Sequence, residues 1–116
     1  MATVQISFQD ASNNEDFFTI YRGDASGNAP TGTTAEVVAT ITWDGTSNWV
    51  IADGALGNTS SAFVAGQVTT NDPSNVGQSF GMQYTESNAG TYVYGVEAEN
   101  SIGKSAITNS SSITIT

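Results

Sequence analysis

The sequence of 116 residues contains no cysteine and no histidine. Without cysteine, the chain can form no disulfide and no thiolate metal site, and it has no thiol nucleophile. Without histidine, it lacks the commonest general base and the commonest transition-metal ligand. Because no nucleophile motif or metal-ligand cluster replaces them, we expect a protein that is not an enzyme and that uses no cofactor and no metal.

Basic residues are almost as scarce, since Arg22 and Lys104 stand against eleven acidic residues and the formal net charge is −9. Nucleic-acid phosphates and anionic membrane surfaces both attract basic proteins. The charge therefore predicts no nucleic-acid partner and no membrane partner. The first ten residues, MATVQISFQD, also lack the basic and apolar regions of a signal peptide, and no run of about 18 apolar residues follows.

No stretch of ten or more residues has helical periodicity. Several short stretches instead alternate between apolar and polar residues and are separated by turn residues, which is typical of an all-β protein. The stretches are 3–9, 17–22, 36–43, 49–52, 78–85 and 90–99, with a further short strand expected within 62–70 and a closing strand within 111–116. We expect one domain over residues 1–116, in the form of an antiparallel sandwich or barrel.

The alternation also predicts which side chains face the core. Those expected to point inward are Val4, Ile6, Phe8, Phe18, Ile20, Val37, Ala39, Ile41, Phe80, Met82, Tyr84, Tyr92, Tyr94, Val96 and Ala98, and Trp43 shares the face of Val37, Ala39 and Ile41. The clearest stretch, 90–105 (GTYVYGVEAENSIGKS), predicts one long strand that ends in a turn at Asn100, Ser101 and Gly103.

The dipeptide Asp44-Gly45 is typical of a tight turn, so 36–43 and 49–52 are predicted to form a hairpin. Such a hairpin brings Trp43 and Trp49 near each other. If both are exposed, they could form a sugar-stacking platform or a protein contact. The alternative is that at least one of them belongs to the core.

Two blocks resemble fibronectin type III domains. Residues 90–105 are similar to the region from strand F to strand G of that family, and residues 6–22 are similar to the region from strand B to strand C of its bacterial members. The matching positions are Thr91, Tyr92, Val96, Ala98, Asn100, Gly103 and Ser105 in the first block, and Phe8, Asn13, Glu15, Phe18, Ile20 and Arg22 in the second, while Tyr84–Glu86 resembles the end of strand E.

The resemblance implies an immunoglobulin-like, fibronectin type III-like antiparallel β-sandwich. It gives Tyr92 the position of the tyrosine corner, whose hydroxyl bonds to backbone in the connection between strands E and F. It implies structural roles for Phe8, Phe18, Ile20, Tyr92, Val96, Ala98 and Gly103.

Two departures from the family concern possible contacts. The chain starts at what would be strand B, so the standard strand A is missing, and the segment 36–77 is longer than the family requires, which suggests an inserted hairpin. A strand B without its neighbour would offer unpaired backbone groups along Thr3–Gln9 to another chain, unless the inserted segment covers them. The interface candidates are Thr3, Gln5, Ser7, Trp43 and Trp49.

Three further motifs have two interpretations each. Arg22-Gly23-Asp24 spells the adhesion tripeptide, or else ends a strand and begins a turn. The oxygen-bearing side chains of Asp10, Asn13, Asn14, Glu15 and Asp16 could bind calcium, or else form a solvated loop. Glu97 and Glu99 are two apart on one strand, and we expect them on its solvent face rather than in a glycosidase pair.

These observations lead to two hypotheses for function. The first is a virion decoration or cement protein, or a tail accessory protein, made in the host cytoplasm and located on the virion surface. It would dock on capsid or tail proteins through its β-edge and hairpin, and could also form a homo-oligomer. The alternative is an extracellular carbohydrate-binding or adhesion module excised from a secreted bacterial protein.

Overall fold

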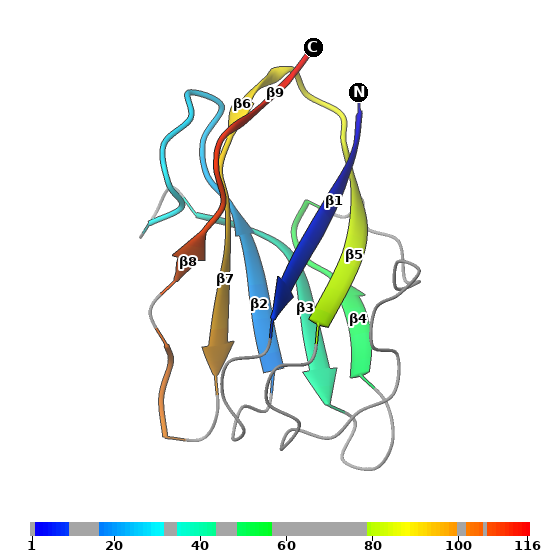
Figure 1. Ribbon diagram of the computed structural model, residues 1–116, viewed down its shortest axis with the longest axis vertical. Helices are drawn as coiled ribbons and strands as arrows, with labels where there is room; N and C mark the ends of the chain where they lie inside the picture. Colours follow the sequence, from blue (N-terminus) through cyan, green and yellow to red (C-terminus); the bar gives the residue numbers. More distant parts are fainter. Residues whose placement is uncertain are drawn as a thin grey trace.

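The computed structural model describes residues 2–9, 17–31, 35–43, 49–56, 79–99, 102–105 and 107–116. These residues form nine strands (Figure 1): β1 (Ala2–Gln9), β2 (Phe17–Arg22), β3 (Glu36–Trp43), β4 (Trp49–Asp53), β5 (Ser79–Glu86), β6 (Gly90–Tyr92), β7 (Tyr94–Glu99), β8 (Thr108–Asn109) and β9 (Ile113–Ile115). All ladders between these strands are antiparallel. The described residues include no helix, so the all-β prediction is confirmed.

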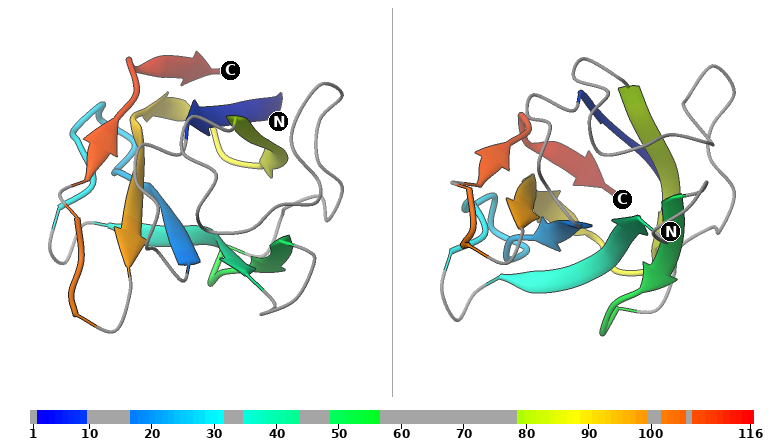
Figure 2. Two further views of the ribbon diagram at one scale, coloured as in Figure 1. Left: turned by 60° about the horizontal axis from the view of Figure 1, so that its bottom comes forward. Right: turned by 90° about the horizontal axis from the view of Figure 1, so that it is seen from below.

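The strands pair in three groups. The largest is a five-stranded sheet with the order β4-β3-β2-β7-β8, and the others are the pairs β1-β5 and β6-β9. The β1-β5 pair crosses in front of β2 and β3 in Figure 1, and the turned views of Figure 2 show it as a separate layer. The five-stranded sheet and the β1-β5 sheet therefore each have one face toward the other sheet and one face toward solvent.

The core lies between these two layers. Its buried members come from both: Val4 and Ile6 of β1, Phe18 and Ile20 of β2, Val38, Ala39 and Ile41 of β3, Met82 and Tyr84 of β5, Tyr92 of β6, Tyr94 of β7 and Ile115 of β9. The rings of Phe8 and Phe18 also meet across the layers, with centroids 5.0 Å apart. For β1, β2 and the described side chains of β5, the predicted inward faces are confirmed.

The inward face predicted for β3 is wrong at one position. Val38, not Val37, is fully buried, because β3 contains a β-bulge. Ile20 pairs with Ala39 but the next residue, Tyr21, pairs with Val37, so Val38 is the extra residue. The carbonyl of Val38 accepts a hydrogen bond from Gly54 N at 2.9 Å, which ties the bulge to the end of β4.

The prediction of one strand over 90–99 is also wrong. The strand is interrupted at Val93, whose carbonyl accepts a hydrogen bond from Gly23 N at 2.9 Å. Before the interruption β6 pairs with β9, and after it β7 pairs with β2 and β8. Between the pairs Tyr92–Ile113 and Gly95–Asn109, the opposite segment has three residues against two. There Ser110 accepts a hydrogen bond from Tyr94 N with its Oγ at 3.1 Å.

The hairpin predicted from Asp44-Gly45 is present as the β3-β4 ladder, in which Trp43 lies opposite Trp49. The short strand expected within 62–70 and the candidate calcium loop within 10–16 lie outside the described residues. So do the side chains of Trp43, Trp49 and Phe80, whose backbones alone are described.

Gly23 provides a test of the close packing beside Val93. A Cβ at this position would lie 2.0 Å from the carbonyl oxygen of Asn28, whereas a Cβ on Gly103 would meet nothing within 4 Å. We expect Gly23→Ala to lower the free energy of unfolding by about 2 kcal/mol or more, because backbone must move. Gly103→Ala should change it by no more than about 0.5 kcal/mol. Urea unfolding of both variants measures the difference, and equal effects would contradict it.

Candidate interaction surface

The position of the β1-β5 sheet depends on a buried ion pair between Arg22 and Glu86. Arg22 is the last residue of β2 and Glu86 is the last residue of β5, and Nη1 of Arg22 donates to Oε1 of Glu86. The side chain of Glu86 is 1% exposed and that of Arg22 is 11% exposed. The pair therefore joins the two layers from within.

Each partner of the ion pair has further contacts. Glu86 accepts hydrogen bonds from Tyr84 Oη at 3.1 Å and from Asn88 N at 3.0 Å. Arg22 Nη2 donates to Oε2 of the exposed Glu36 at 3.1 Å, and its guanidinium carbon lies 4.6 Å from the ring centroid of Tyr92. A buried carboxylate with several donors and a paired cation is well compensated for its loss of water.

These contacts shift two pKa values. Burial by itself would raise the pKa of Glu86, but the hydrogen bond from Asn88 N and the contact with the Arg22 guanidinium outweigh it and lower that pKa. Burial, followed by the negative charge of Glu86 and the hydrogen bond to it, raises the pKa of Tyr84 to about 12. At neutral pH the carboxylate is thus charged and the phenol keeps its proton.

Tyr92 connects this cluster to the turn after β5. Its hydroxyl donates to the carbonyl of Asn88 at 3.2 Å and also approaches the carbonyl of Ala89 at 3.4 Å. This is the contact that the tyrosine-corner resemblance implies. Tyr92 is 1% exposed, so its ring contacts the Arg22 guanidinium within the core.

The outer face of the β1-β5 sheet carries no charge. Its members in the described chain are Thr3, Gln5 and Ser7 of β1 and Gln83 and Thr85 of β5, which we call the β1-β5 face. Thr3 lies opposite Thr85, and Gln5 lies opposite Gln83. Within these two strands the single charged residue is Glu86, which is buried in the ion pair. On a chain of net charge −9, this surface is neutral and polar.

The edge of this sheet at β1 also lacks charged residues. Strand β1 pairs with β5 on one side, and the described part of the chain offers no strand for its other side. The sequence of β1, ATVQISFQ, contains no lysine, no proline and no charge. Lysine, proline and charged side chains are features by which natural proteins prevent an edge strand from pairing with another chain. Their lack is consistent with a partner at this edge.

The outer face of the five-stranded sheet is different because it carries charges. Glu97 on β7 accepts a hydrogen bond from Tyr21 Oη at 3.1 Å, and Lys104 Nζ lies 3.8 Å from Glu97 and 3.5 Å from Glu99. Glu97 lies on the outer face of β7, as expected, but is only 9% exposed. The neighbouring Tyr21 and Lys104 cover it. Exposed Lys104 gains a raised pKa from the two glutamates.

The structure places the remaining predicted structural residues as follows. Val96 and Ala98 are partly buried against the core, and Gly103 lies exposed in the turn between β7 and β8. The turn is held by Ser105 N donating to the carbonyl of Ala98 at 2.8 Å.

The Arg22-Gly23-Asp24 tripeptide is not displayed as an adhesion motif would be. Arg22 is buried in the ion pair, so its guanidinium is not available to a receptor. The carboxylate of Asp24 accepts hydrogen bonds from Ser26 N at 3.0 Å and from Asn28 Nδ2 at 2.9 Å. The interpretation as a strand end followed by a turn is the one that the structure agrees with.

Among the described residues there is no group of three or more acidic side chains that could hold a metal ion. Nor does that part of the chain include a helix able to span a membrane.

Comparison with known proteins finds no match: no family model fits the sequence, and neither a curated protein nor a solved structure matches it. The candidate surface therefore stands on the geometry of this chain alone.

The ion pair makes stability depend on pH. Folding lowers the pKa of Glu86, so its charge contributes to the free energy of unfolding. The contribution is fully present above the pKa of an unfolded glutamate and is lost as pH falls through the lowered pKa of the folded state. We expect Glu86→Gln to lower the free energy of unfolding by about 3–5 kcal/mol at pH 7, since Arg22 loses its buried partner. The difference from wild type should shrink at pH 3.

Denaturant unfolding at both pH values measures this effect. Glu36→Gln is the matched control, because Glu36 contacts the same guanidinium but its side chain is 53% exposed. The control should cost no more than about 1 kcal/mol. A pH-independent loss in Glu86→Gln would show that the charge of Glu86 is not what stabilises the pair.

Proposed function

We propose that this protein is a non-enzymatic structural module that docks on a large protein assembly, as a virion decoration, cement or tail accessory protein does. The observation that carries the proposal is the neutral β1-β5 face, with its unprotected β1 edge, on a strongly anionic chain. The core of a protein interface is depleted in charged residues, so such a surface suits a protein partner. The proposed location is the virion surface.

We further propose that the chain has the fibronectin type III-like arrangement, with an extra hairpin strand. In that scheme β1 and β5 correspond to strands B and E, and β2, β3, β7 and β8 correspond to strands C, C′, F and G. The pairing of β1 with β5, and the order β3-β2-β7-β8, support this correspondence. The place beside β1 would then be the place of strand A.

Docking would use backbone hydrogen bonds more than side-chain chemistry. A strand of the partner would add to β1, and the polar side chains Thr3, Gln5 and Ser7 would tolerate desolvation better than charges. The surrounding negative charge would favour a partner with a basic rim. Capsid or tail proteins, or a second copy of this chain in a homo-oligomer, could supply the strand.

Amide hydrogen exchange on the isolated, dilute chain tests the proposal. Strand β2 lies between β3 and β7, so amides of Thr19 and Ile20 should exchange slowly. In β1, alternate amides between Val4 and Ser7 point away from β5 and should exchange much faster. Sedimentation at rising concentration shows whether self-association then protects them. Uniformly slow exchange along β1 in a dilute monomer would mean that the edge is already covered, and the docking proposal would fail.

A second candidate function is a carbohydrate-binding or adhesion module of an extracellular protein. The observation that favours it is the register of the β3-β4 hairpin, which sets Trp43 directly opposite Trp49. Two aromatic residues in this arrangement are suited to stacking on sugar rings.

A glycan array decides between the two functions. If the chain is a glycan-binding module, it should bind a defined set of glycans, and Trp43→Ala should abolish this binding. Val50→Ala, on the neighbouring half-exposed position of β4, is the control that should retain it. A stable monomer that binds glycans would replace the assembly proposal, and a blank array would remove the second candidate.

A further inference from the structure

Two buried polar atoms have no hydrogen-bond partner in the described structure: Nε of Arg22 and Oη of Tyr94. Both atoms are themselves buried, in residues that are 4% (Tyr94) and 9% (Arg22) exposed. Buried polar groups in native proteins nearly always have a partner, either protein or ordered water. Each of these two atoms is therefore a candidate for a partner other than the described side chains.

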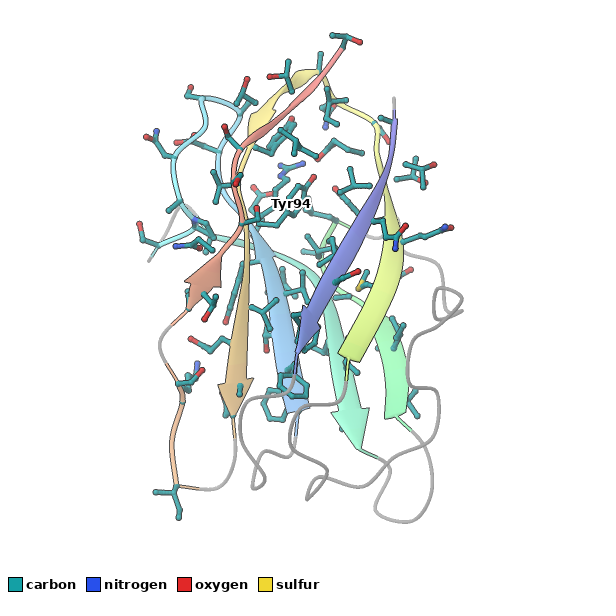
Figure 3. The ribbon with its side chains drawn as sticks, viewed as in Figure 1. Tyr94 is labelled. Atoms are coloured by element: carbon teal, nitrogen blue, oxygen red, sulfur yellow. The ribbon has the colours of Figure 1, made fainter. Side chains whose placement is uncertain are left out.

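The two atoms belong to neighbouring side chains. Arg22 and Tyr94 are direct partners in the ladder between β2 and β7, so their side chains leave the sheet on the same face. That face points inward, and Figure 3 shows Tyr94 directed from β7 into the interior. The two residues also share a neighbour, because the ring of Tyr92 lies 4.6 Å from the Arg22 guanidinium carbon and 6.4 Å from the ring of Tyr94.

The chemistry of the surroundings restricts the ligand. The Nε–H of arginine can only donate, so the ligand must accept a hydrogen bond, while the tyrosine hydroxyl can donate or accept. An anion is disfavoured because Glu86 and Glu36 already contact the Arg22 charge. A metal cation cannot accept the hydrogen bond that Nε–H offers. A small neutral molecule with both donor and acceptor capacity remains.

We propose that one buried water molecule bridges Arg22 and Tyr94, accepting a hydrogen bond from Nε–H and sharing another with the tyrosine hydroxyl. With this water, all three nitrogens of the Arg22 guanidinium have partners: Glu86 at Nη1, Glu36 at Nη2 and the water at Nε. The water thereby fixes the orientation in which Arg22 meets Glu86. Buried waters that link otherwise unsatisfied groups are common in domains of this size.

The state of Tyr94 agrees with this role. Burial, followed by the negative charge of Glu86, raises the pKa of Tyr94, so the hydroxyl keeps its proton at any ordinary pH. The ring contacts Tyr84 edge-on at a centroid distance of 6.0 Å, which holds the hydroxyl in place.

A crystal structure at a resolution that defines ordered waters tests the proposal directly. The expected result is one density peak within hydrogen-bond distance of both Arg22 Nε and Tyr94 Oη. Two separate waters, a water on one atom alone, a protein acceptor at Nε or no peak would each overturn it.

The effect of Tyr94→Phe on stability gives a second test that needs no crystal. If the water is bound, removing the hydroxyl breaks a hydrogen bond, and the unfolding equilibrium constant should rise by about three- to tenfold. If Tyr94 Oη has no partner, its removal relieves a buried polar group, so an unchanged or lower constant would overturn the proposal. Tyr84→Phe is the matched control, because its hydroxyl has a known partner in Glu86 and its loss should be destabilising in either case.

Discussion

The ion pair between Arg22 and Glu86 is the interaction on which the arrangement of the two layers depends. It connects the last residue of β2 with the last residue of β5 and lies against the aromatic rings that close this end of the core. Because a buried charge without a partner is very costly, neither strand can shift along its axis without exposing or isolating one of the two groups. The pair therefore specifies the register of the β1-β5 sheet over the larger sheet, in addition to any stability that it contributes.

Much of the fold is predictable from alternation because the strands are short and amphipathic. The inward residues of β1 and β2, such as Ile6 and Ile20, follow directly from a period of two. The prediction fails where two adjacent residues are both apolar. Val37 and Val38 are chemically equivalent in the sequence, so the bulge that buries Val38 leaves no trace there. The interruption at Val93 is also hidden from the sequence, because it depends on a backbone hydrogen bond from Gly23.

The candidate surface was predictable in part. Alternation places Thr3, Gln5 and Ser7 outward, but their partners across the sheet, Gln83 and Thr85, depend on a strand pairing that spans about 80 residues of sequence. The buried ion pair was missed altogether, although a signal existed. Arg22 has the same parity as Phe18 and Ile20, and Glu86 has the same parity as Met82 and Tyr84. Two opposite charges on inward positions at strand ends are a pattern that sequence reasoning could use.

The scarcity of basic residues has a practical consequence. Both basic side chains of the chain are engaged with carboxylates, and Lys104 is the single lysine. Amine-directed labels would therefore find a single side-chain amine, on the charged side of the molecule, besides the α-amino group of the chain. The described side chains of the β1-β5 face include no lysine and no carboxylate, so amine- and carboxyl-directed cross-linkers have no side chain to react with there. A contact made through that face would have to be mapped with reagents that act on backbone or on neutral side chains.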